Sequence, residues 1–181
     1  MSLDLVVGCM FSGKSTELIR IVRRLETISE NYIVIKPKID IRYSTDKVST
    51  HDKVEHKCII KENLISLLGE YAYMEATHII IEEAQFFPDL EPFVLKAVDD
   101  DKKHITVFGL DGDSDRNNFG QIHKLYPLCD SIKKLKALCL KCNDGTEAIF
   151  SKRIIDDKEQ TSIGAEDKYI AVCRLCFLNN K

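Results

Sequence analysis

The sequence has no long apolar run and no excess of positive charge. No stretch approaches the roughly 20 apolar residues of a membrane span, and the N-terminus lacks the basic and apolar segments of a secretory signal. The formal net charge of −3 and the isoelectric point near 6.0 give no electrostatic footprint for nucleic acid. We interpret the local basic run Lys133, Lys134 and Lys136 as a solvated face. We therefore expect a cytoplasmic protein without a membrane or nucleic-acid partner.

Internal repeats and low-complexity segments are also missing. The 181 residues are enough to bury a core and suit one domain with a small appendage. The cysteine count is odd, at seven, and in a chain that we expect to be intracellular such cysteines serve metal binding more readily than disulfides.

What is present, first of all, is a phosphate-binding pattern near the N-terminus. The pattern GxxxxGK[ST] is matched without a gap, and Thr16 follows it, in the run Gly8, Cys9, Met10, Phe11, Ser12, Gly13, Lys14, Ser15. A buried-type apolar run at 3–7 precedes the loop. Residues with the spacing of a helix face follow it, namely Leu18, Ile21, Val22, Leu25 and Ile28.

This strand–loop–helix context predicts a nucleotide cradle. Backbone amides at a helix N-terminus point at anionic oxygens, and the helix dipole adds partial positive charge. Lys14 would reach the outer phosphates and the hydroxyl of Ser15 would ligate a magnesium ion. The alternative is a glycine-rich turn with a surface Lys-Ser pair.

Further strands and helices alternate along the chain. We expect strands at 32–35, at the start of 59–68, at 77–81 and at 104–110, with helices in the rest of 59–68 and over 86–98. Such alternation indicates right-handed crossovers and a mainly parallel sheet. The fold class is therefore α/β, of the P-loop NTPase type, with helices flanking the sheet.

Two acids, Glu82 and Glu83, follow the strand at 77–81. Ligands of open α/β sheets bind at the carboxyl ends of strands, so these acids should face the phosphates. Because consecutive strand residues point oppositely, we assign Glu82 to magnesium and Glu83 to the attacking nucleophile. The alternative is a pair of surface acids. The next residues, Phe86 and Phe87, either pack in the core, which the sequence slightly favours, or wall an aromatic pocket.

The composition of the chain changes near the C-terminus, where two CxxC pairs appear. They are Cys139 with Cys142 and Cys173 with Cys176, and four thiolates complete a closed tetrahedral zinc site of the structural kind. The alternative is redox chemistry or coincidence. We expect two domains: one at 1–136, which binds the nucleotide, and one at 137–181, which holds zinc and the polar segment between the two pairs.

In order along the chain, these motifs resemble those of the type II thymidine kinase family. The likeness covers both CxxC pairs and the segments 10–18, 40–43, 50–52, 83–88, 110–112, 119–120, 152–153 and 167–169. The resemblance implies transfer of the terminal phosphoryl group of ATP to the 5′-hydroxyl of thymidine, possible acceptance of deoxyuridine, magnesium as cofactor, Glu83 as general base and a homotetramer. It also implies a lasso loop that closes over the nucleoside between the cysteine pairs, pinned by zinc.

The resemblance carries further site residues over to this chain. Beside the phosphate loop and Glu82, it places ATP near Asp40, Arg42 and Gln85, although the residues alone favour a solvated connection for the loop that holds Asp40 and Arg42. The nucleoside contacts would be Met10, Phe86, Leu110, Phe119, Ser151, Tyr169 and the main chain of Gln160, Thr161, Ser162, Ile163 and Gly164.

Several positions depart from the family's pattern. Glu82 stands where Asp is usual, Cys9 where Pro is usual, Ala165 where Gly is usual, and Ser114 where a phenylalanine is expected near the base. These departures bear on thymidine selectivity more than on catalysis. The alternatives are a DNA-binding P-loop ATPase with a zinc ribbon and a non-enzymatic nucleotide-gated module, but the acidic chain offers no basic track and the catalytic acid disfavours the latter.

Overall fold

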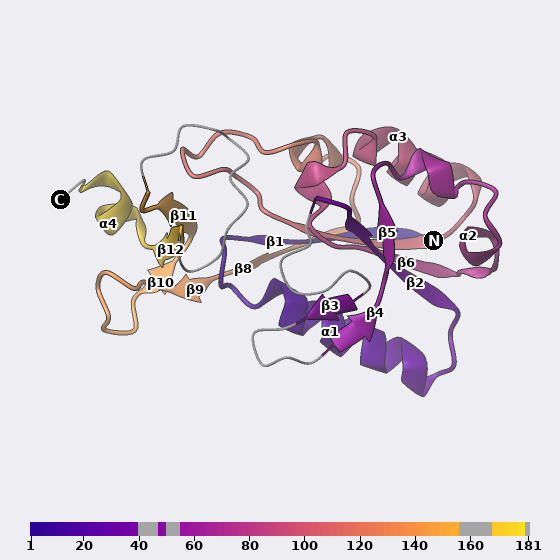
Figure 1. The fold of residues 1–181 in the computed structure, drawn as a ribbon, viewed down its shortest axis with the longest axis horizontal. Helices are drawn as coiled ribbons and strands as arrows, with labels where there is room; N and C mark the ends of the chain where they lie inside the picture. Colours follow the sequence, from indigo (N-terminus) through magenta and orange to yellow (C-terminus); the bar gives the residue numbers. More distant parts are fainter. Residues whose placement is uncertain (40–46, 50–54, 156–167, 180–181) are drawn as a thin grey trace.

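The computed structural model describes residues 1–39, 47–49, 55–155 and 168–179. A six-stranded sheet forms its centre, with all neighbouring strands parallel in the order β5-β2-β6-β7-β1-β8 (Figure 1). The bounds are β1 Ser2–Gly8, β2 Tyr32–Pro37, β5 Ile59–Lys61, β6 His78–Ile81, β7 His104–Gly109 and β8 Ser131–Leu135. The expected parallel α/β sheet is thus confirmed.

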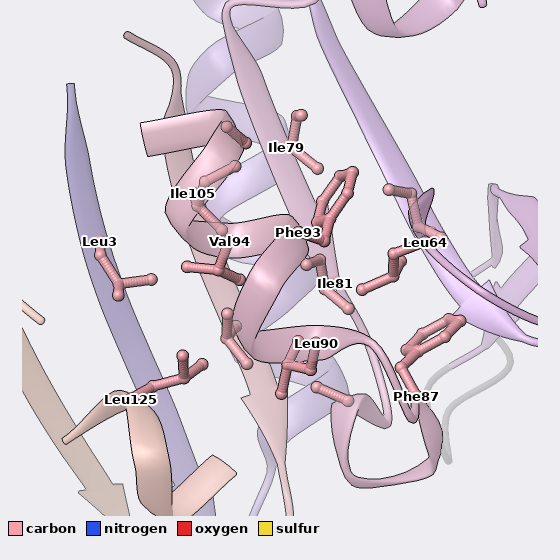
Figure 2. Close-up of a cluster of buried hydrophobic side chains, with 14 of the residues drawn as sticks. Leu3, Leu64, Ile79, Ile81, Phe87, Leu90, Phe93, Val94, Ile105 and Leu125 are labelled. Atoms are coloured by element: carbon pink, nitrogen blue, oxygen red, sulfur yellow. The ribbon is translucent and has the colours of Figure 1, made fainter. Parts of the chain in front are cut away.

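Helices cover both faces of the sheet. They are α1 Lys14–Thr27, α2 Tyr71–Glu75 and α3 Leu90–Leu95, with a π-helical turn at Lys96–Asp100 and 3-10 turns at Ile65–Leu67, Ala84–Phe86 and Ile122–Leu125. Strand residues alternate between the faces: Val6 and Ile80 pack with α1, while Leu5 and Ile81 pack with α3. Figure 2 shows Phe93 and other α3 side chains over the strands.

Two of the expected helices differ from the structure. Helix α1 ends at Thr27, and Ile28, expected on its apolar face, is 66 % exposed because the chain reverses at the next residue, Ser29, with φ 54°. The helix expected over 86–98 is broken: after the 3-10 turn, Pro88 lies outside helical structure and α3 begins at Leu90.

The segment after β5 also forms less helix than expected. It makes a 3-10 turn, Ile65–Leu67, where we expected an α-helix. The apolar residues that suggested the helix, Leu64 and Leu67, are nevertheless fully buried. Their burial fixes the segment against the core without a regular helix.

Strand β8 was missed because its side chains are mostly charged or exposed. Lys133 and Lys134, which we interpreted as a solvated face, lie on this edge strand and pair with Glu17 and Asp111. Lysines on an edge strand discourage pairing with another chain, so the basic run is part of the sheet edge.

Glu17 links α1 to this edge, and its ionisation should make the stability of the fold depend on pH. Hydrogen bonds from Arg20 first, and from Lys133, lower the pKa of Glu17 to about 2 from an ordinary 4.5. A lowered folded-state pKa adds stability that is present above the ordinary pKa and is lost as the pH falls toward the folded one. Urea unfolding should therefore show a Glu17→Gln deficit that shrinks between pH about 4.5 and about 2. A deficit that is constant over this range would show that ionised Glu17 does not stabilise the edge.

A smaller unit follows the main sheet and lies at one end of the ribbon (Figure 1). Its elements are β9 Ala137–Leu138 paired with β10 Glu147–Ala148, β11 Phe150–Arg153 paired with β12 Tyr169–Val172, and α4 Arg174–Leu178. A short antiparallel pair, β3 Lys47–Ser49 and β4 Glu55–Lys57, lies elsewhere in the chain. Within the described residues, no helix is long and apolar enough to cross a membrane.

Candidate active site

The loop between β1 and α1 has a conformation that needs glycine. Gly13, directly before α1, has φ 84°, in a region where a Cβ causes strain. Beside it, the buried hydroxyl oxygen of Ser12 has no hydrogen-bond partner within the part of the chain that the structure describes. Buried hydroxyls are nearly always hydrogen-bonded, so this one fits a loop that takes an oxygen of a ligand. The expected strand–loop–helix arrangement is present.

The ammonium group of Lys14 lies over the loop that carries it. Its Nζ donates to the carbonyl oxygens of Gly8 at 3.1 Å and Cys9 at 2.9 Å. Burial lowers the pKa of this ammonium. Nearby negative charges oppose this effect, and the Glu83 carboxylate opposes it most strongly. The chain neighbours of these two residues, Ser15 and Glu82, are joined by a hydrogen bond, so Lys14 and Glu83 belong to one site.

Ser15 and Glu82 are also joined. The Ser15 hydroxyl donates to Glu82 Oε1 at 2.8 Å. The Glu82 side chain is buried, and its backbone amide donates to Ile35 of the neighbouring strand at 2.8 Å. A hydroxyl and a carboxylate oxygen are the hard ligands that magnesium prefers, so the two residues fit the ion predicted for them.

Glu83 is presented differently from the way we expected. Strand β6 ends at Ile81, so neither acid lies on the strand, and alternation along a strand does not separate them. Instead, Glu83 has φ 48°, in the left-handed region. A non-glycine residue in this region is strained and persists only where its surroundings hold it. The separation of the two acids therefore comes from a turn.

The residues expected near the nucleoside form two contacts. Phe86 and Phe119 meet edge to face, with ring centroids 5.4 Å apart, and Phe87, unlike Phe86, is in the core. The Met10 amide donates to Ser151 Oγ at 2.9 Å, which joins the phosphate loop to strand β11 of the smaller unit.

Two further expected residues have contacts of their own. The amide of Leu110 donates to Gln85 Oε1 at 3.1 Å, and Tyr169, which is buried, accepts a hydrogen bond from Arg153. The remaining expected contacts lie outside the described residues: Asp40, Arg42, Gln160, Thr161, Ser162, Ile163 and Gly164.

Sequence reasoning missed Asp111 as a site residue. It follows β7, pairs with Lys134, and its charge reaches Lys14. The signal was available, because Asp111 lies just beyond the carboxyl end of a buried strand, as Glu82 does.

The four cysteines of the CxxC pairs form a cluster. The sulfur atoms of Cys139, Cys142, Cys173 and Cys176 all lie within 4.8 Å of one another. Tetrahedral zinc with bonds of about 2.3 Å needs sulfurs about 3.8 Å apart, and Cys142 Sγ lies 3.8 Å from Cys173 and 3.4 Å from Cys176. Burial opposes ionisation of Cys139, but backbone hydrogen bonds, led by that of Cys173, hold the pKa of its thiol at about 6. The cluster fits a structural zinc ion.

The fold and site define a mainly parallel α/β protein with basic and acidic side chains gathered at the carboxyl ends of its strands and a four-cysteine cluster beside its first loop. The family model described as thymidine kinase matches residues 1–177, and the chain belongs to the thymidine kinase family.

Curated relatives agree with this assignment over almost the whole chain. A thymidine kinase of Fowlpox virus is 39 % identical over 99 % of this chain and 98 % of its own length. The cytosolic thymidine kinase of Homo sapiens is 40 % identical over 97 % of this chain and 72 % of its own length. A thymidine kinase of Oryza sativa is 42 % identical over 99 % of this chain and 67 % of its own length.

Proposed function

We propose that this protein is an ATP-dependent thymidine kinase of nucleotide salvage, which transfers the γ-phosphoryl group of ATP to the 5′-hydroxyl of thymidine and gives thymidine monophosphate. Family membership supports the activity. The single structural observation that carries the proposal is the convergence of Lys14, Ser15 and two acids on one site. This convergence also supports a P-loop NTPase type of sheet.

The phosphate loop binds the donor. Backbone amides at the start of α1 receive the phosphate oxygens, and Lys14 leaves the loop carbonyls to contact the outer phosphates. Ser15 and Glu82 hold magnesium, which when bound neutralises the charge that develops on the phosphates. Asp40 and Arg42 complete the proposed ATP set.

Glu83 handles the proton of the acceptor. As the 5′-oxygen attacks the γ-phosphorus, its proton passes to the Glu83 carboxylate, the bond from phosphorus to the bridging oxygen breaks, and ADP leaves.

The nucleoside lies between the aromatic pair, Phe86 and Phe119, and the smaller unit. By the family resemblance, the loop between the two cysteine pairs closes over the nucleoside and reads its base, and zinc pins both ends of this polar loop. In this proposal 1–136 and 137–181 act as separate domains, and the enzyme works as a cytoplasmic homotetramer without a nucleic-acid partner.

Labelled ATP tests the activity directly. The purified protein is offered γ-labelled ATP and magnesium with thymidine, deoxyuridine, deoxycytidine or deoxyguanosine in parallel. We expect label in thymidine monophosphate, with deoxyuridine as the next acceptor. Ser114 stands where the family pattern has a phenylalanine near the base, so the rates with the other pyrimidine nucleosides measure selectivity separately from activity. ATP hydrolysis that DNA stimulates, without labelled nucleotide, would favour the DNA-binding ATPase instead.

The proposed role of Glu82 predicts how a substitution there changes the dependence of turnover on magnesium. We expect Glu82 to hold the ion through a bound water, and loss of such an outer carboxylate, as in Glu82→Gln, costs about 10- to 100-fold in metal affinity. The magnesium concentration for half-maximal turnover should rise by about that factor. Glu82→Asp, the residue usual in the family, is the matched control and should stay near wild type. An unchanged magnesium dependence in Glu82→Gln would remove Glu82 from the metal site.

A further inference from the structure

Gln85 lies behind the proposed general base and contacts it. Its Nε2 donates to Glu83 Oε2 at 2.5 Å. Its Oε1 accepts from the amide of Leu110, at the end of β7, at 3.1 Å. Only 4 % of Gln85 is exposed, so this amide is a fixed part of the interior beneath the site.

The contact with Leu110 decides which way the amide faces. A backbone N–H can only donate, so the oxygen of Gln85 must face Leu110 and its NH₂ group must face Glu83. Neither Glu, which brings a second charge, nor an apolar residue could satisfy both neighbours in the same way. The sequence therefore presents a donor, in a fixed orientation, to one oxygen of the base.

Two glycines make room for this residue. A Cβ on Gly120 would collide with the backbone carbonyl of Gln85, and a Cβ on Gly109 would lie 2.6 Å from its Oε1. Gly109 ends β7, directly before Leu110. Backbone on both sides thus packs closely around Gln85, which limits the movement of its side chain.

We infer that Gln85 is a positioning residue for the base: it binds Glu83 Oε2 and thereby directs the other carboxylate oxygen, Oε1, to the acceptor's 5′-hydroxyl. This inference rests on the proposed role of Glu83. It gives Gln85 a different duty from the ATP contact that the family resemblance implies. The left-handed φ of Glu83 makes such a support necessary, because a strained residue stays in place only if its surroundings hold it.

The test is a double-mutant cycle on single-turnover phosphoryl transfer. Gln85→Met keeps the size of the side chain and removes both hydrogen bonds, and it should lower the transfer rate about a hundredfold, the cost of a reacting group displaced by about 1 Å. The KM for ATP should stay within about twofold of wild type, because the phosphate loop is untouched. Gln85→Asn, which keeps the amide, should recover part of the rate.

The same substitution made in a Glu83→Ala background distinguishes a positioning role of Gln85 from a general structural role. If Gln85 acts through Glu83, Gln85→Met should add less than about twofold to the loss already caused by Glu83→Ala. A full additional hundredfold loss, or a rise in the KM for ATP of the single variant with an unchanged transfer rate, would overturn the inference. Failure of wild-type protein to phosphorylate thymidine would instead refute the proposed function.

Gln121 offers a matched control. Its side-chain amide also makes two hydrogen bonds, donating to the carbonyl of Pro88 and accepting from the backbone amide of Glu91, and neither partner is Glu83. Gln121→Met should keep the wild-type transfer rate, although it also loses both amide hydrogen bonds. Equal losses of rate in the two variants would show that lost amide bonds, and not the position of the base, explain the effect.

Discussion

Glu83→Gln should lower kcat about a hundredfold to ten-thousandfold, the usual contribution of a positioned general base. The amide cannot take the proton of the 5′-hydroxyl, but it has nearly the same size and keeps the turn. Because the phosphate loop is unchanged, the affinity for ATP measured by calorimetry should stay near wild type. Steady-state kinetics with thymidine as the varied substrate gives the loss in kcat.

A surface variant shows whether the loss is specific. Glu91→Gln removes a carboxylate that pairs with Lys124 on the surface, and it should leave kcat unchanged. If Glu83→Gln retains the turnover of this control, Glu83 is not the base, and Asp111 becomes the carboxylate to test next.

Loss of the cysteine cluster should have the second large effect. Cys173→Ser removes one of four ligands, and zinc binding is coupled to the folding of its site. We expect the protein to lose zinc by elemental analysis and its KM for thymidine to rise at least about tenfold, which corresponds to about 1.4 kcal/mol.

The effect should also reach the phosphate loop. Cys9, which is 3 % exposed, packs in the same apolar cluster as Cys139 and Cys173, and the next residue, Met10, is bonded to Ser151. The KM for ATP should therefore rise too. Cys129→Ser, outside the cluster, is the control and should keep both constants. Full activity in a folded protein that contains no zinc would contradict this account.

The strands of the core could be predicted from the sequence because burial on both faces leaves an unbroken apolar run. This holds for β6 and β7, whose bounds agree with the expected ones to within a residue. It fails for β8, where one side of the edge strand faces solvent and carries lysines. The helix expected over 86–98 begins later than predicted, at Leu90, since Pro88 favours an extended conformation at Phe87, and apolar spacing does not report this effect.

The site was only partly predictable for a related reason. A motif such as GxxxxGK[ST] has fixed spacing, so the phosphate loop and the cysteine pairs stand out in the chain. The hydrogen bond between Gln85 and Leu110 joins residues 25 positions apart, and that between Met10 and Ser151 joins residues 141 positions apart. Only the fold brings those partners together, and no spacing in the sequence indicates them.

The most direct test of the central claim is a crystal structure with magnesium and a bisubstrate analogue in which thymidine and adenosine are joined through a phosphate chain. We expect phosphates on the loop that contains Lys14, magnesium at Ser15 and Glu82, and the thymidine 5′-oxygen about 2.6 to 3.2 Å from a carboxylate oxygen of Glu83. A structure in which the 5′-oxygen lies beside another carboxylate, with Glu83 turned away from the phosphates, would contradict the account.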